Sequence, residues 1–192
     1  MGDPSADIMS ATYRALCEHG YAELTMQRIA DESGRSKAAL HYHYDTKEEL
    51  LDAFLDYMLD EFESRLACEA ADPAERLETF LDAVYDPPGD GTGEFPVALL
   101  EIKAQAPYHD AYRERLVEMD ERMRDIVADA VADGVASDAF DDCDPTDVAR
   151  FVVTVINGGH AREVALGESR EQGRRLVETY LDRTLGREEV SA

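Results

Sequence analysis

The chain has 192 residues, of which 43 are acidic and 19 are basic, so its formal net charge is −24. Its 44% apolar content is enough for a sizeable core. Because no stretch approaches about 18 consecutive apolar residues and the N-terminus lacks the apolar run of a signal peptide, the sequence excludes a membrane-spanning helix and predicts a cytoplasmic protein.

Three short helices are predicted first. Apolar residues at helical spacing predict one over residues 5–19. Thr25 is a suitable N-cap for a second helix, which Gly34 ends. Ser36 is a suitable N-cap for a third helix over residues 37–44.

The rest of the chain also has the pattern of helices, and no alternating strand pattern of useful length is present. Thr46 and Glu49 form a capping box that starts a fourth helix. Further helices are expected over about 73–85, 94–105, 109–136, 145–166 and 169–185. We therefore expect an all-α fold of about nine helices, with an N-terminal three-helix helix-turn-helix module over residues 1–52 and a C-terminal helical bundle over residues 53–192.

Residues 25–44 have the spacing of a helix-turn-helix, because a short helix, a tight turn and a second short helix follow one another. On the second of these helices, Leu40 and Tyr44 are four residues apart and share a face. We expect them to pack against Ile29 and Ala30.

The other side of that second helix is suited to DNA. Ala38 and Ala39 are small enough for close approach, while Lys37 and His41 can donate hydrogen bonds to base edges or phosphates. Lys47, in the first turn of the next helix, is a poor partner for that helix's dipole. We expect Lys47 to bind a phosphate beside free backbone N–H groups.

The run GYAELTMQRIADESGRSKAALHYHYDTKEEL, residues 20–50, resembles the N-terminal DNA-binding region of the tetracycline-repressor (TetR) family of transcriptional regulators. The resemblance extends over residues 8–55, and beyond residue 60 only the helical architecture is similar. It implies phosphate contacts from Thr25, Ser36, Tyr42, His43 and Lys47. It implies base-facing positions for Gln27, Lys37, Ala38, Ala39 and His41.

This sequence departs from the family pattern at three positions. His41 stands where the family usually has Tyr, Tyr44 stands where it has Phe, and Arg35 replaces a small apolar turn residue. We expect Arg35 and His41 to be this protein's own specificity or phosphate contacts.

Other interpretations of these residues compete with DNA binding. His41 and His43 are candidates for a metal pair, but residues two apart on a helix point in roughly opposite directions. Lys37 and Lys47 are candidates for ordinary solvated charges. We expect no metal and no cofactor, since the three cysteines lack Cys-x-x-Cys spacing.

Two explanations fit the acidity. Many carboxylates keep a surface hydrated in a cytoplasm rich in potassium chloride, where salt screens their repulsion, so we expect a halophilic source. The alternative is an acidic face for a basic partner, but the acidic residues are spread along the whole chain. Residues 1–57 themselves hold five basic and eleven acidic residues. The attraction of this region to DNA must therefore be local, and we expect the affinity for DNA to depend only weakly on salt concentration.

The last two predicted helices each carry an apolar stripe. We expect them to form the four-helix interface of a homodimer, which would place two recognition helices about 34–36 Å apart to read a palindrome. The alternative is that the stripes belong to the core of a monomer. The predicted interface residues are Val148, Phe151, Val152, Val155, Gly159, Leu176 and Tyr180.

Aromatic residues and methionines at helical spacing are usually core residues, but as a set they can also line an apolar pocket. The family resemblance implies such a pocket, in which a small-molecule effector moves the DNA-binding heads apart. The predicted pocket residues are Phe54, Met58, Phe62, Phe80, Tyr112, Met119, Asn157 and His160. Residues 86–93 are a candidate pocket lid or a surface connection.

The sequence predicts a regulator and no enzyme, because it contains no Gly-x-Ser-x-Gly, no glycine-rich phosphate loop and no Glu-x-x-His pairs. We expect a sequence-specific DNA-binding transcriptional regulator, a ligand-released repressor that binds a palindromic operator as a homodimer. The alternative is an architectural DNA-binding or protein-interaction module that needs no ligand.

Overall fold

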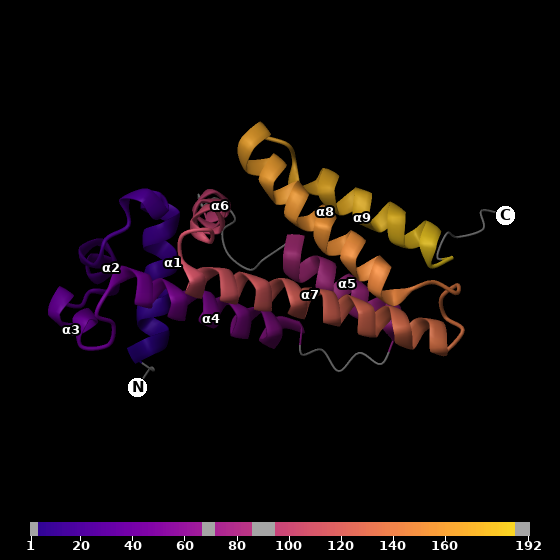
Figure 1. Ribbon diagram of the computed structural model, residues 1–192, viewed down its shortest axis with the longest axis horizontal. Helices are drawn as coiled ribbons and strands as arrows, with labels where there is room; N and C mark the ends of the chain where they lie inside the picture. Colours follow the sequence, from indigo (N-terminus) through magenta and orange to yellow (C-terminus); the bar gives the residue numbers. More distant parts are fainter. Residues whose placement is uncertain (1–3, 67–71, 86–94, 187–192) are drawn as a thin grey trace. The chain divides into compact units, whose positions relative to one another are not determined.

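The computed structural model describes residues 4–66, 72–85 and 95–186. Within these ranges the chain forms nine α-helices and no strand, which confirms the expected all-α fold (Figure 1). None of these helices is long and apolar enough to cross a bilayer. The helices are α1 (Pro4–Glu23), α2 (Met26–Ser33), α3 (Lys37–His41), α4 (Lys47–Leu66), α5 (Pro73–Tyr85), α6 (Phe95–Gln105), α7 (Asp110–Ala136), α8 (Pro145–Leu166) and α9 (Arg170–Thr184).

Side-chain caps and left-handed glycines set the ends of several helices where the sequence predicted them. The hydroxyl of Thr25 accepts the Arg28 N–H at 3.2 Å and starts α2, and Gly34 ends it with φ 64°. In α8, Asp144 accepts the Thr146 N–H at 2.9 Å, and Gly167 ends the helix with φ 68°. These are local signals, so the sequence alone is sufficient to locate them.

Helix α3 is shorter than predicted. Ser36 caps it as expected, accepting the Ala39 N–H at 3.1 Å. The helix ends at His41 with Tyr42 as its C-cap, and the following residues form turns before α4 begins. At the start of α4, Thr46 accepts the Glu49 N–H at 3.1 Å, while the Glu49 carboxylate accepts the N–H of Asp45 at 2.8 Å.

The helices are divided between two compact units. The first unit comprises the chain up to Glu61, together with α6 and α7 up to Val117. Its buried core draws on α1, α2, α3, α4, α6 and the start of α7, so the helix-turn-helix shares a core with helices far along the chain. Members of this core include Ile8, Leu16, Ile29, Leu40, Leu50, Phe54, Ile102 and Tyr112.

The second unit begins at Phe62 and contains α5, the rest of α7, α8 and α9. Within it α9 packs against both α5 and α8. Gly134 on α7 lies so close to the Phe140 ring that a Cβ there would overlap the ring. The core includes Phe80, Leu81, Val127, Val131, Phe140, Val152, Val177 and Leu181.

Two of the predicted interface residues, Val148 and Val152, are core residues instead. Both are almost completely buried among side chains of the second unit's own core, so they present no surface to a partner. The prediction was wrong at these positions because an apolar stripe on a helix does not distinguish burial against the same chain from burial against another.

The predicted pocket residues are divided between the two cores. Phe54 and Tyr112 are buried in the core of the first unit, and Phe62 and Phe80 are buried in that of the second. In the second unit, the Phe62 and Phe80 rings pack edge to face, with centroids 6.2 Å apart. For these four residues the burial matches the alternative expectation of ordinary core packing.

Removing the Tyr85 hydroxyl should not weaken the second unit. This hydroxyl is buried and has no hydrogen-bond partner among the described residues, and burial raises the pKa of Tyr85 to about 12. Because an unpaired buried hydroxyl costs desolvation without compensation, Tyr85→Phe should leave the free energy of unfolding unchanged or raise it by up to about 1 kcal/mol. Guanidinium titration measures this change, and a clear loss of stability would reveal a partner for the hydroxyl.

Candidate nucleic-acid interface

Helix α3 has one buried side chain among its five residues, that of Leu40. Leu40 joins Ile29 in the core of the first unit. Tyr44, one turn further along the chain, is half-buried against the same core, and its hydroxyl lies 3.5 Å from the Ser5 Oγ. These residues hold α3 in place as the sequence predicted.

The remaining side chains of α3 point away from the core. Lys37, Ala38 and His41 are exposed, and Ala39 is half-buried. The small alanines leave the helix surface flat beside two side chains that carry donors. Small side chains beside hydrogen-bond donors are the chemistry that a major-groove contact needs.

Tyr42 and His43 extend the same surface beyond the end of α3. The Tyr42 side chain is 86% exposed, and the His43 ring lies edge-on to it with centroids 5.2 Å apart. A large aromatic side chain this exposed makes little contribution to the core, and its hydroxyl is free to donate to a phosphate.

Residues before α3 have partners within the protein. The Thr25 and Ser36 hydroxyls accept N–H groups as caps, and each keeps its own hydrogen for a further acceptor. Gln27 donates to the Asp31 carboxylate at 2.7 Å. Arg35 forms an ion pair with Asp7 at 3.0 Å, so it must leave Asp7 if it is to contact DNA.

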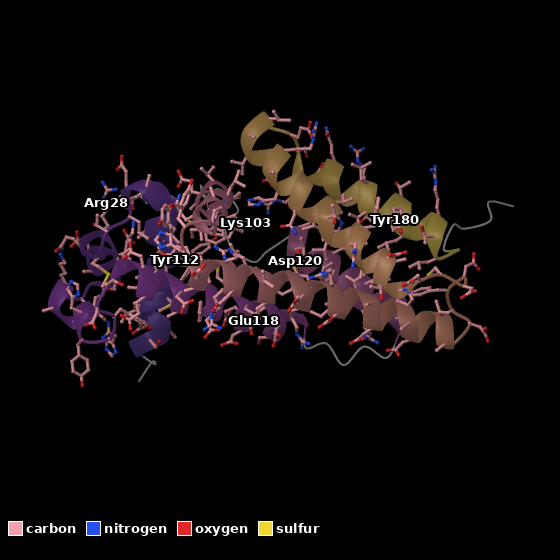
Figure 2. All side chains as sticks on the ribbon, viewed as in Figure 1. Arg28, Lys103, Tyr112, Glu118, Asp120 and Tyr180 are labelled. Atoms are coloured by element: carbon pink, nitrogen blue, oxygen red, sulfur yellow. The ribbon has the colours of Figure 1, made fainter. Side chains whose placement is uncertain are left out.

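In the described region of the helix-turn-helix, the arginines form ion pairs with carboxylates, whereas Lys37 and Lys47 do not. Arg14 pairs with Glu32 at 3.3 Å, and Arg28, labelled in Figure 2, pairs with Glu23 at 2.8 Å. Among all lysines and arginines in the described chain up to residue 64, only Lys37 and Lys47 have no carboxylate partner. The positive charge left uncompensated in this region therefore lies on α3 and at the start of α4.

Lys47 contacts the aromatic ring of Tyr21, which was not among the predicted site residues. Its Nζ lies 4.5 Å from the centroid of the Tyr21 ring, a cation–π contact. Tyr21 belongs to the GY pair at the start of the motif, which is the one local signal for it. Glu101, which binds the Tyr21 backbone, lies 80 residues away in the chain and has no such signal.

The predicted interface residues of α8 and α9 include an apolar patch, defined here as Phe151, Val155, Leu176 and Tyr180. Phe151 is 42% and Leu176 is 64% exposed, while Val155 and Tyr180 are half-buried. The Phe151 and Tyr180 rings stack with centroids 3.8 Å apart and join the two helices. The Gly159 backbone lies beside Gly173 of α9, so this glycine serves close packing of α8 on α9.

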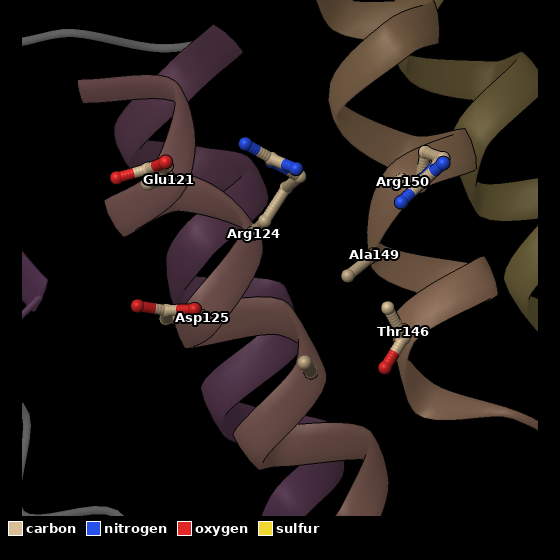
Figure 3. A pocket seen from close by; sticks show the side chains of 7 residues that line it. Glu121, Arg124, Asp125, Thr146, Ala149 and Arg150 are labelled. Carbon is tan, nitrogen blue, oxygen red and sulfur yellow. The ribbon is translucent and has the colours of Figure 1, made fainter. Parts of the chain in front are cut away.

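A cleft in the second unit lies between α7 and α8 (Figure 3). Its volume is about 390 Å³, and it is lined by Glu121, Arg124, Asp125, Ala128, Thr146, Ala149 and Arg150. None of the predicted pocket residues lines it. Of these, Asn157 donates to Asp120 at 3.3 Å and to the Val153 carbonyl at 3.1 Å, Met119 and His160 are half-buried, and Met58 packs against the first core. The candidate lid, 86–93, lies outside the described residues.

Comparisons with known proteins agree with this arrangement. A family model described as bacterial regulatory proteins, tetR family, matches residues 8–54. A second, described as BetI-type transcriptional repressor, C-terminal, matches residues 73–186. The HTH-type transcriptional regulator LmrA of Bacillus subtilis (strain 168) is 30% identical over 137 residues, which are 64% of this chain and 72% of that protein.

Solved structures with the same fold include two informative ones. A TetR transcription regulator from Haloarcula marismortui ATCC 43049 is 43% identical, with a TM-score of 0.87 over 94% of this chain and 97% of that one. A transcriptional regulator from Saccharomonospora viridis in complex with choline is 21% identical, with a TM-score of 0.82 over 94% and 96% of the two chains. The two family models together match both the helix-turn-helix and the C-terminal helices, and they show that the chain belongs to the TetR family of transcriptional regulators.

Proposed function

We propose that the protein is a homodimeric repressor that binds a palindromic operator through α3, Tyr42, His43 and Lys47. The observation that carries the proposal is the placement of the uncompensated lysines. In a chain with a net charge of −24, Lys37 and Lys47 lie without carboxylate partners at the surface where DNA is expected. Thr25, Gln27, Arg35 and Ser36 would add contacts from the preceding helix and turn.

The apolar patch of α8 and α9 supports the homodimer. An exposed leucine beside a stacked pair of aromatic rings is a surface that a second copy of the chain would cover. The two-fold axis would then present two copies of α3 about one helical turn of DNA apart.

Release by a small molecule is the regulatory part of the proposal. The chain's C-terminal helices match a BetI-type repressor model, and the S. viridis regulator holds choline. A quaternary ammonium compound of the choline class is therefore the first effector to test. Salt adaptation is also part of the proposal, since the Haloarcula protein is similar over nearly the whole chain.

Fluorescence anisotropy with DNA from upstream of the protein's own gene tests the proposal, beside a scrambled duplex, from about 0.1 to about 2 M potassium chloride. Tight binding to the first duplex alone, weakened by choline, would support a ligand-released repressor. Equal binding to both duplexes would favour the architectural alternative, and no binding would contradict the function at this operator.

Single substitutions test the assigned contacts. Tyr42→Ala should weaken binding to every duplex by about three- to tenfold, because it removes a phosphate contact without touching the core. Tyr108→Ala is the matched control, since Tyr108 is 81% exposed but lies in the turn before α7.

Lys37→Ala and His41→Ala should instead change which bases are preferred. Unchanged preferences would remove these two residues from base readout.

A further inference from the structure

Helix α1 is interrupted at Gly20, which has a left-handed φ of 67° and an extended ψ of 174°. At this break the backbone N–H of Tyr21 donates to the Glu101 carboxylate of α6 at 2.7 Å. A Cβ on Gly20 would lie 3.0 Å from the same carboxylate oxygen, so only glycine fits both the backbone conformation and the approach of Glu101. A hydrogen bond from an amide to a carboxylate is stronger than one between neutral groups.

The Tyr21 side chain connects this hydrogen bond to the DNA-facing surface. Its ring carries the Lys47 ammonium, 4.5 Å from the ring centroid. Lys47 lies in the first turn of α4, which also holds two acidic residues, Glu48 and Glu49. The ring gives the Lys47 ammonium a defined contact on the protein surface.

The Tyr21 side chain also packs against a core that includes a residue of α7. Tyr112, labelled in Figure 2 at the start of α7, is buried in the core against which Tyr21 packs, and its hydroxyl has no hydrogen-bond partner among the described residues. Burial is the main reason that the pKa of each tyrosine is raised, and Glu48 raises both further. Tyr21 is therefore fixed at its backbone by α6, while its side chain packs against the core that includes Tyr112 of α7.

The geometry points to Glu101 and Tyr21 as positioning residues that hold Lys47 ready for its phosphate contact. This inference rests on the proposed DNA-binding function. A lysine side chain has four flexible methylene groups, and ordering them on binding costs conformational entropy. The Tyr21 ring removes part of that cost before DNA arrives. Any displacement of α6 that withdraws Glu101 would loosen Tyr21 and, with it, Lys47.

Two pairs of substitutions test this in the full-length protein. Glu101→Leu removes the acceptor, whereas Glu101→Gln keeps a carbonyl oxygen in its place. Tyr21→Leu removes the ring, whereas Tyr21→Phe keeps it. Glu114→Leu, on the exposed surface of α7, removes the same charge as Glu101→Leu without touching Tyr21.

Nuclear magnetic resonance gives a readout that needs no DNA. The Lys47 ε-methylene protons should resonate upfield in the wild-type protein because they lie over the Tyr21 ring. Tyr21→Leu should abolish this shift and Glu101→Leu should reduce it, while Tyr21→Phe, Glu101→Gln and Glu114→Leu retain it. A Lys47 resonance that does not respond to Glu101→Leu would overturn the inference even if the protein bound no DNA.

Operator affinity gives the functional readout. Glu101→Leu and Tyr21→Leu should each weaken binding about two- to fivefold, as expected for losing an exposed cation–π contact. In a Lys47→Ala background neither should have a further effect. Equal losses in both backgrounds would show that Glu101 acts on the stability of the head and not through Lys47, which would also overturn the inference. If the wild-type protein fails to bind DNA while the resonances behave as expected, the proposed function fails and the positioning stands.

Discussion

Replacing Leu40 with alanine should lower the free energy of unfolding of the first unit by about 3 kcal/mol and abolish DNA binding, although Leu40 is completely buried and faces no DNA. The reason is that α3 has a single buried side chain. Truncating it removes apolar burial and leaves a cavity, and a helix of five residues has no intrinsic stability to hold it in place.

Guanidinium titration and hydrogen exchange of the α3 amides measure the effect. His41→Ala is the matched control, because His41 lies next to Leu40 but is exposed, and its replacement should change stability by less than about 0.5 kcal/mol. If Leu40→Ala kept the stability and the exchange protection of the wild type, Leu40 would not be the anchor of the recognition helix.

Introducing glutamate at both Phe151 and Leu176 should separate the proposed dimer. Each substitution places a carboxylate in the apolar patch, and two-fold symmetry doubles every added charge at the interface. Hot-spot residues at the centre of an interface contribute about 2 kcal/mol or more each, so if Phe151 and Leu176 are such residues the dimer dissociation constant should rise by about two orders of magnitude or more.

Analytical ultracentrifugation at fixed potassium chloride measures the change in association. Because each subunit already carries a net charge of −24, the separation should be greater at low salt, where repulsion is less screened. Val117→Glu is the control, since it adds a carboxylate at an exposed apolar position of α7. Dimers that survive the double substitution would place the interface elsewhere, and loss of operator binding in monomers would link pairing to recognition.

Local signals predicted most of the helix ends. Pro145 and Gly167 bound α8 as expected, and Thr25 and Gly34 bound α2, because caps and left-handed glycines act within one turn of the chain. The C-terminal limit of α3 was misplaced, since the residues after His41 have helical composition but lie in turns.

Long-range placement was the part that the sequence did not reveal. Phe54 and Phe80 have the same side chain, and each lies at helical spacing from other apolar residues. They nevertheless belong to different cores. Val152 and Leu176 both lie on apolar stripes, yet one is buried in its own chain and the other is exposed. The contact between Glu101 and Tyr21 joins residues far apart in the chain, and no helical periodicity encodes it.

The recognition helix also separates the residues that hold it from the residues that would read DNA. Only Leu40 is committed to the core, so Lys37, Ala38 and His41 are open to replacement with little effect on folding. A gene duplicate of this protein would therefore be able to acquire a new operator through a few codon changes on α3. The proposed dimer and effector response would be inherited unaltered, so new regulatory circuits would arise without an intermediate sequence that fails to fold.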